Sequence, residues 1–381
     1  MEIKPFLETM VSHNASDIYL TVGTSPMYRI EGVTQSLGGE VFTPSAMEIL
    51  ARSVMNDQQW QKFDEQWEMN LALSYSEFSR FRVNVFRRRG SVGIVVRKIN
   101  FDIATLDDLG LCPVLKDIML AKRGLILVIG ATGSGKSTSL AAMIDHRNSN
   151  TSGHIVTIED PVEFVHRHKK SIVNQREVGS DTHSFQAALK SAMRQAPDVI
   201  FIGEIRDRET MEAAITFADT GHLCLATLHS TNANQAFERI INFFPEPQHA
   251  QIFLQLSLNL RAIISQRLVL GIDSRRVAAL EILLDTPRIK TLIKRGEVDT
   301  LKEAMVQADL EGCQTFDMAL FDLYSSGSID LEQALSNADS VNNLRLKIKV
   351  NETQDTGAEG VKPPPGLRLE AARVARRFER L

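Results

Sequence analysis

The strongest constraint on the fold of this chain is a glycine-rich segment at residues 130–137. It matches the pattern G-x-x-x-x-G-K-[ST] and lies between an apolar run, Leu125–Ile129, and a segment with helical character. Glycines let the backbone N–H groups of such a loop surround phosphate oxygens, because they have no Cβ atom. The residues that we expect to bind nucleotide are Gly130, Ala131, Thr132, Gly133, Ser134, Gly135, Lys136, Ser137 and Thr138.

Two side chains of this loop have distinct expected roles. The ammonium group of Lys136 would bridge the β- and γ-phosphates, and the hydroxyl of Ser137 would ligate Mg²⁺. The helix that follows directs its positive end at the same place. The sequence therefore predicts an α/β domain that binds a nucleoside triphosphate and Mg²⁺. No Asn-Lys-x-Asp motif of the GTPase kind occurs, although the loop itself does not distinguish ATP from GTP.

Acidic side chains are expected near this loop. The apolar strand Val199–Ile202 leads to Glu204, and the apolar strand His154–Ile158 leads to an acidic box that ends at Glu163. The carboxyl ends of parallel strands meet at one edge of a sheet, and a metal-bound nucleotide would offset repulsion among carboxylates there. We expect Glu163 to be the general base and Glu204 to support the metal. The sequence leaves open which carboxylate has which role, and a solvated acidic turn is the alternative for the box.

Another short apolar strand is bracketed by His222 and His229. The two histidines are too far apart along a strand to share one zinc ion, so a zinc site is disfavoured. Because Thr227 and Asn232 make this region polar, we expect both histidines to lie near the γ-phosphate. Ordinary core or surface histidines are the alternative.

Residues 1–100 indicate a separate α/β domain rich in antiparallel strands. The strands Arg80–Phe86 and Val92–Ile99 predict a hairpin in which Arg82 lies directly across from Arg97. Opposed like charges destabilise a sheet, and a γ-phosphate from a neighbouring subunit would remove that penalty. A solvated basic face or a contact with nucleic acid is the alternative.

The remaining chain divides by composition and periodicity. We expect a helix near Ser45–Phe63, a linker at residues 101–113, and an ATPase domain at residues 114–350 with a mostly parallel sheet and C-terminal helices. Residues 351–381 predict a flexible tail. Within it, Leu367–Leu381 is either a short basic amphipathic helix that docks on a partner or membrane, or a frayed end.

Composition excludes several classes of protein. The formal net charge of -4 argues against a protein that coats nucleic acid. The cysteines lie far apart without a C-x-x-C pair, which predicts free thiols in a reducing compartment. We find neither a signal-peptide pattern nor an apolar run of about 20 residues, so we expect a cytoplasmic protein without a transmembrane segment.

These motifs, in this order, resemble the type IV pilus retraction ATPases PilT and PilU of the secretion ATPase superfamily. The match covers nearly all of residues 1–350 and includes Ser16–Leu20 and Arg80–Asn84. The resemblance implies a PAS-like N-terminal domain, a RecA-like ATPase domain, and a homohexamer that binds ATP between subunits below an inner-membrane platform protein. The residues to which it assigns catalytic or phosphate-coupling roles are Glu163, Glu204, Arg82, Arg97, His222 and His229.

Within this family the chain looks closer to PilU, because its C-terminal region is extended through Leu346 and continues beyond Asn351. That likeness implies action together with a PilT-type ATPase, at the inner membrane. Extension and type II secretion motors usually carry a tetracysteine zinc module, and its absence favours retraction. The alternatives are an ATP-binding regulatory or structural ring subunit, and a RecA-like DNA motor supported only by the arginine hairpin. We expect no nucleic-acid partner.

Overall fold

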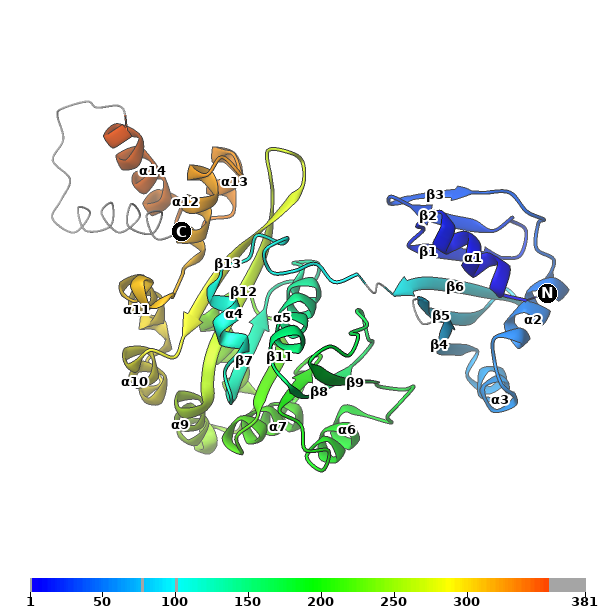
Figure 1. The fold of residues 1–381 in the computed structure, drawn as a ribbon, viewed down its shortest axis with the longest axis horizontal. Helices are drawn as coiled ribbons and strands as arrows, with labels where there is room; N and C mark the ends of the chain where they lie inside the picture. The colour runs from blue at the N-terminus through cyan, green and yellow to red at the C-terminus, as the bar shows by residue number, and fades with distance from the viewer. Residues whose placement is uncertain (1, 77–78, 100–101, 356–381) are drawn as a thin grey trace.

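The computed structural model describes residues 2–76, 79–99 and 102–355, and Figure 1 shows two bodies, each built on its own β-sheet. The first sheet has six strands and the second has seven, and helices follow the second sheet at the C-terminus. The predicted fold class, a PAS-like N-terminal α/β domain followed by a RecA-like domain with a helical C-terminal region, is confirmed. The domain boundaries at residues 100, 113 and 350 stay predictions, although the last strand of the first sheet ends at Ile99.

The N-terminal body consists of α1 (Lys4–Ser12), β1 (Asp17–Thr21), β2 (Met27–Ile30), β3 (Val33–Ser36), α2 (Pro44–Ser53), α3 (Asp57–Gln66), β4 (Glu68–Ser76), β5 (Ser79–Arg88) and β6 (Ser91–Ile99). The strand order is β3-β2-β1-β6-β5-β4, and every pair is antiparallel. Alternate residues such as Ile18, Leu20, Val83 and Val85 are buried. One face of the sheet therefore packs on the helices, and the opposite face carries polar side chains.

The prediction of one helix near Ser45–Phe63 is wrong, because α2 ends at Ser53 and α3 begins at Asp57. Asn56 caps the second helix. Its side chain accepts a hydrogen bond from the N–H of Gln59, and the Gln59 side chain accepts one from the N–H of Asn56. This reciprocal capping box starts a new helix within a segment whose apolar periodicity alone indicates a single helix.

The predicted hairpin between β5 and β6 is confirmed. Arg82 pairs with Arg97 in the register of the two strands. The turn residues Arg89 and Gly90 have φ values of 46° and 75°, as a tight two-residue hairpin turn requires.

The second sheet and its helices consist of α4 (Val114–Met119), β7 (Gly124–Ile129), α5 (Lys136–Asn150), β8 (Gly153–Glu159), β9 (Ser171–Glu177), α6 (Phe185–Ala192), β10 (Val199–Ile202), α7 (Arg208–Asp219), β11 (Leu223–Leu228), α8 (Ala233–Asn242), α9 (His249–Asn259), β12 (Leu260–Leu270) and β13 (Arg276–Leu284). The strand order is β13-β12-β7-β11-β10-β8-β9. All pairs are parallel except β12 with β13, so the predicted mostly parallel sheet is confirmed.

Helices cover both faces of this sheet. α4 and α5 contribute to the hydrophobic core on one face, and α6 to α9 contribute to the core on the other. Consequently β7, β10 and β11 are buried along their whole length. The carboxyl ends of these strands, and of β8 beside them, point to the same edge of the sheet, which is where ligands bind in such folds.

The helices after β13 are α10 (Pro287–Arg295), α11 (Leu301–Gln307), α12 (Phe316–Ser325), α13 (Leu331–Ser336) and α14 (Val341–Asp355). Phe316, Leu320 and Ile348 form a small core with residues of β12 and β13. α14 extends to Asp355, beyond residue 351, where the tail is predicted to begin; the flexible tail itself stays a prediction. Residues 356–381, including the segment predicted as an amphipathic helix, lie outside the described residues.

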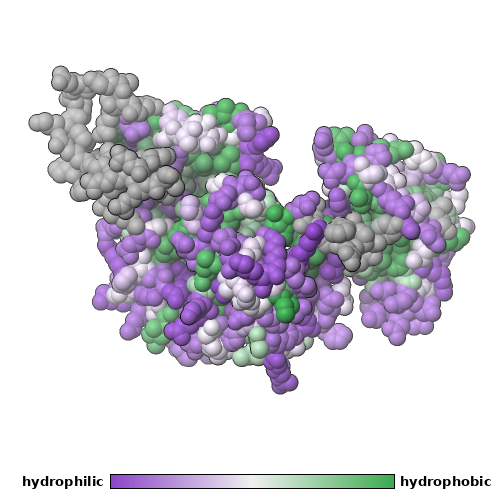
Figure 2. Space-filling model, in the orientation of Figure 1, coloured by the Kyte–Doolittle hydropathy of each residue, from purple (hydrophilic) through white to green (hydrophobic). Residues whose placement is uncertain are grey.

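The face of the molecule shown in Figure 2 is mainly hydrophilic. On the face shown in Figure 2, hydrophobic residues are scattered among hydrophilic ones. Within residues 2–76, 79–99 and 102–355, no helix has the length and apolar character needed to cross a bilayer. All the cysteines, Cys112, Cys224 and Cys313, carry free thiols.

Candidate nucleotide site

The glycine-rich loop lies between β7 and α5, where the sequence predicts it. It packs tightly against β12. At Gly130, φ is 152°, and an added Cβ atom would lie 2.5 Å from the Ser134 hydroxyl oxygen and 2.6 Å from the carbonyl oxygen of Gln266. Only glycine fits at this position, so the chain that enters the loop is fixed against the neighbouring strand.

The Lys136 ammonium group turns back into the loop. Its Nζ donates hydrogen bonds to the carbonyl oxygens of Gly130 and Ala131, at 2.7 and 2.8 Å. Burial lowers the pKa of Lys136, and the negative charges of Glu204 and Glu163 oppose this shift. Among the described residues Lys136 makes no ion pair, so a phosphate group would give it the anionic partner that it lacks.

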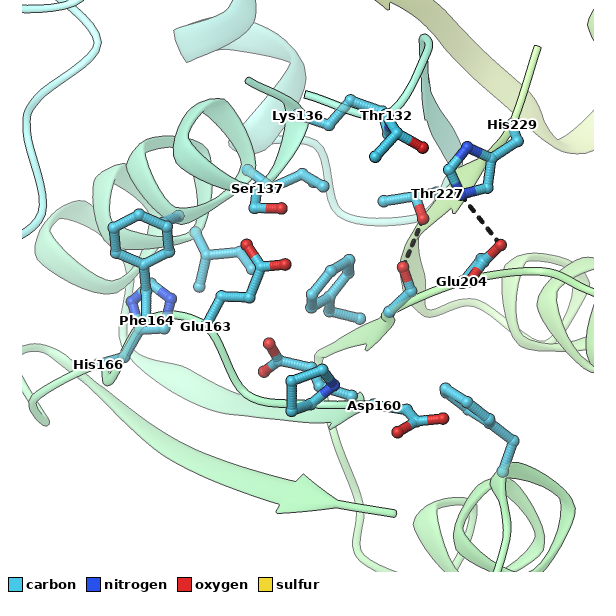
Figure 3. A pocket seen from close by; sticks show the side chains of 18 of the residues that line it. Thr132, Lys136, Ser137, Asp160, Glu163, Phe164, His166, Glu204, Thr227 and His229 are labelled. Carbon is cyan, nitrogen blue, oxygen red and sulfur yellow. Dashed lines mark hydrogen bonds and ion pairs between the residues drawn. The ribbon is translucent and has the colours of Figure 1, made fainter. Parts of the chain in front are cut away.

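A cavity of about 280 Å³ opens beside the loop at the carboxyl edge of the sheet. In Figure 3 the carboxylate of Glu163 points toward Ser137, and Glu204 lies beside His229 on another wall. The predicted site residues that line this cavity are Thr132, Gly133, Lys136, Ser137, Glu163, Glu204 and His229. Gly130, Ala131 and Ser134 line an adjoining hollow on the β12 side of the loop. The fold thus brings the loop, the acidic box and the strand ends of β10 and β11 together.

Both carboxylate oxygens of Glu204 are engaged. Oε2 lies 2.6 Å from Nε of Arg206, and Oε1 lies 3.1 Å from Nε2 of His229. Arg206 also reaches Asp160 at 3.3 Å. The hydrogen bond with Glu204 is the main reason that the pKa of Arg206 is raised. Glu204 therefore belongs to a charge network that connects β8, β10 and β11.

His222 lies at the opposite end of β11 from His229, because it precedes the strand and His229 follows it. Its Nδ1 lies 3.1 Å from the carbonyl oxygen of Phe217 and 3.0 Å from the hydroxyl of Thr220. The prediction that both histidines reach the same edge of the sheet is therefore wrong for His222 in this chain.

Arg82 and Arg97 lie in the N-terminal sheet rather than on the wall of this cavity. The strand registers place Arg97 between Arg82 on β5 and Asp17 on β1. Nε of Arg97 donates a hydrogen bond to Asp17 at 2.7 Å, and this bond is the main reason that the pKa of Arg97 is raised. The negative charge of Asp17, in the same chain, thus reduces the repulsion between Arg82 and Arg97. The Arg97 side chain is still 66% exposed, so it remains accessible to a second anion.

Two buried side chains on the wall of the cavity, Glu159 and His166, are absent from the predicted site. Burial is the main cause that raises the pKa of Glu159 to about 7, and burial lowers the pKa of His166 to about 4. Glu159 belongs to the acidic box, but a row of acids does not show which of them is buried. For His166 the sequence carries no signal that we recognise.

The residues around the cavity fit Mg²⁺ that arrives with a nucleotide. Within the part of the chain that the structure describes, no group of three or more His, Cys, Asp or Glu side chains could hold a metal by itself. Magnesium at phosphate sites needs only one or two protein oxygens, because phosphate and water supply the others. The Ser137 hydroxyl and the Glu204 carboxylate line the same cavity and are donors of this kind.

Comparison with known proteins places the chain in a family. A family model for type II/IV secretion system proteins matches residues 1–316. The type IV pilus ATPase PilU of Pseudomonas aeruginosa is 50% identical over 356 residues, which cover 93% of each chain. This chain belongs to the type II/IV secretion family, as a pilus ATPase of the PilT/PilU type.

Other relatives of this ATPase agree. PilT of the same bacterium is 41% identical over 338 residues, covering 89% of this chain and 98% of the relative. A crystal structure of the pilus retraction motor PilT with bound ADP is 41% identical and superposes with a TM-score of 0.84 over 91% of this chain and 99% of that one. The predicted likeness to PilU rather than PilT agrees with the higher identity to PilU.

Proposed function

We propose that this ATPase is a motor subunit that powers type IV pilus retraction together with a PilT-type ATPase. One observation carries the proposal. In a chain that is 50% identical to a PilU, the loop with Lys136 and Ser137 faces Glu163 and Glu204 across one cavity. This arrangement supplies a phosphate cradle, oxygen ligands for a metal, and a carboxylate for proton transfer.

In this proposal each side chain has a part in hydrolysis. Lys136 exchanges its bonds to two loop carbonyls for bonds to the β- and γ-phosphates. The Ser137 hydroxyl and the Glu204 carboxylate would hold Mg²⁺, which would neutralise charge on the transferred phosphoryl group. Glu163 accepts the proton of the attacking water. His229 contacts Glu204, so a change in the position of Glu204 when the γ-phosphate is bound or lost would also move His229.

We further propose that the working assembly is a homohexamer with composite sites. Arg82 and Arg97 lie outside the cavity of their own chain, on the polar face of the N-terminal sheet, so they would act on a nucleotide held by a neighbouring subunit. In this scheme residues 1–100 form the arginine-bearing domain, residues 101–113 the linker, and residues 114–350 the ATPase domain. The ring works in the cytoplasm, bound to an inner-membrane platform protein.

Two other functions differ in what they require. A regulatory or structural ring subunit needs nucleotide binding but not hydrolysis. A DNA motor needs a basic surface, and the arginines of β5 and β6 are the feature of this chain that supports this function. Strongly salt-dependent binding to single-stranded DNA would favour it.

The test is ATPase activity of the purified chain as a function of protein concentration. We expect activity per subunit to rise steeply with concentration, and to be lost in Lys136→Ala, Glu163→Gln and Arg82→Ala. Lys98→Ala, which removes another basic side chain from the same sheet, is the control and should keep wild-type activity. Activity that is linear in concentration and insensitive to Arg82→Ala would contradict composite sites.

The role in cells requires a separate comparison. Pilus retraction should be lost both on deletion of the chain and in the Lys136→Ala variant. If the variant supports retraction and the deletion does not, the chain is a structural ring subunit.

A further inference from the structure

The turn that carries Glu163 is tied to a second carboxyl group. Glu159, the last residue of β8, is only 8% exposed. Its Oε1 accepts hydrogen bonds from the Thr157 hydroxyl at 2.6 Å and from Nε2 of Gln175 at 3.2 Å. The main-chain N–H of Glu163 also interacts with this carboxyl group. Glu159 thus connects the rigid end of the strand to the residue proposed as the base.

The same glutamine fixes the chain on the other side of Glu163. Nε2 of Gln175 donates to the carbonyl oxygen of Phe164 at 2.9 Å, and its Oε1 accepts from the main-chain N–H of His166 at 2.7 Å. Figure 3 shows Phe164 and His166 next to Glu163. The backbone before and after the base is therefore held by one buried network that includes Glu159.

Electrostatics couples the two carboxyl groups. Burial is the main cause that raises the pKa of Glu159 to about 7; the bonds from Thr157 and Gln175 lower it, and the charge of Glu163 raises it. A charge that appears on Glu159 near neutral pH makes Glu163 a stronger base, because like charges favour protonation of their neighbour. The other charged or titratable groups that line this cavity or pair with the end of β8 are Asp160, Glu177, Glu204, Lys136, His166 and His229, of which His166 is neutral at these pH values. The charge of Arg97 in the N-terminal sheet also acts on Glu163.

We propose that Glu159 is a positioning residue for hydrolysis, which orients the Glu163 carboxylate toward the attacking water and sets its basicity. The inference rests on the proposed function, in which Glu163 is the base. Glu159 itself needs no contact with the nucleotide, because its hydrogen bonds run to the strand, to β9 and to the turn.

The decisive variant is Glu159→Gln, which keeps the volume and an oxygen acceptor but cannot ionise. In the wild type, Glu159 gains its charge as the pH rises through about 7, so the variant mimics the low-pH state at every pH. The ratio of wild-type to variant kcat should be within about twofold at pH 6 and rise to about tenfold at pH 8.5. The KM for ATP and the Kd of a fluorescent ADP analogue should stay unchanged.

A second variant tests the same idea without changing the carboxyl group. Thr157→Val keeps the shape of the side chain and removes a hydrogen bond that lowers the pKa of Glu159. The inflection of the pH–kcat profile should therefore move to higher pH. Thr157→Ser keeps the hydroxyl and should show the wild-type profile.

Each outcome bears on one claim. If the ratio of wild-type kcat to Glu159→Gln kcat stays constant from pH 6 to pH 8.5, the inference is overturned. A purely structural role of Glu159 would give such a constant ratio, because it does not depend on the ionisation of the carboxyl group. If Glu159→Gln loses ADP binding through misfolding, Thr157→Val decides, and an unmoved inflection overturns the inference. A wild-type chain that hydrolyses no ATP at any concentration contradicts the proposed function instead.

Discussion

Replacing Glu281 by alanine should destabilise the ATPase domain, whereas replacing it by glutamine should not. Glu281 lies on β13 and is 3% exposed. Its Oε1 accepts hydrogen bonds from the N–H of Ala233 and from the Ser265 hydroxyl, each at 2.8 Å. Ala233 is the first residue of α8, so this buried carboxyl group ties β12 and β13 to the helix that follows the histidine segment.

The magnitude follows from the groups left without partners. Glu281→Ala leaves two buried polar groups unpaired, at about 1–3 kcal/mol each, so we expect a loss of about 2–6 kcal/mol. Glu281→Gln keeps an oxygen that accepts both bonds. It also removes a group that is costly to ionise, because burial raises the pKa of Glu281 above its ordinary value. The part of the stability that depends on the proton of Glu281 is complete below its unfolded pKa and is lost as the pH rises through its folded pKa, whereas the two hydrogen bonds to Oε1 remain.

The assay is thermal unfolding at pH 5 and pH 8, following the transition that bound ADP shifts upward. Glu281→Ala should lower the midpoint of this transition by several degrees at both pH values. Glu281→Gln should match the wild type at pH 5 and exceed it at pH 8. Equal losses in the two variants, or an advantage of glutamine that grows toward low pH, would refute the reasoning.

Two further predictions concern the loop and the cysteines. Gly130→Ala should weaken binding of a fluorescent ADP analogue at least about tenfold, because backbone of β12 lies 2.6 Å from the added carbon. Burial raises the pKa of the Cys224 thiol, and raises that of Cys313 to about 11. A thiol reagent at pH 8 should therefore modify Cys112 first, and equal labelling of all three in the folded protein, measured by mass spectrometry, would contradict the buried positions.

The features that could be predicted from the sequence depend on neighbouring residues. The phosphate loop is a local pattern whose glycines meet a local need for positive φ, so its place between strand and helix follows directly. The pairing of Arg82 with Arg97 follows from the turn at Arg89 and Gly90, because the length of a hairpin turn sets the register of both strands.

The features that could not be predicted depend on distant residues or on strand direction. His222 precedes β11 and His229 follows it, so only His229 lies at the carboxyl edge of the sheet. The apolar run between the two histidines does not show the direction of the strand. Gln175 on β9 and Gln266 on β12 act on Glu159 and Gly130 only after the sheet is assembled. Their contributions come from tertiary packing, for which a single sequence has no periodic signal.

The partners of the charged groups favour Glu163 over Glu204 as the base. Lys136 satisfies its ammonium group with loop carbonyls, Glu204 binds both Arg206 and His229, and Glu159 reduces its charge by holding a proton up to a pH of about 7. Among the described residues, the Glu163 side chain has neither an ion pair nor a hydrogen bond, and it is exposed to the cavity. A general base must have a free lone pair directed at water in the state that precedes the reaction. Glu204 would have to break an ion pair to act as the base, whereas Glu163 would not.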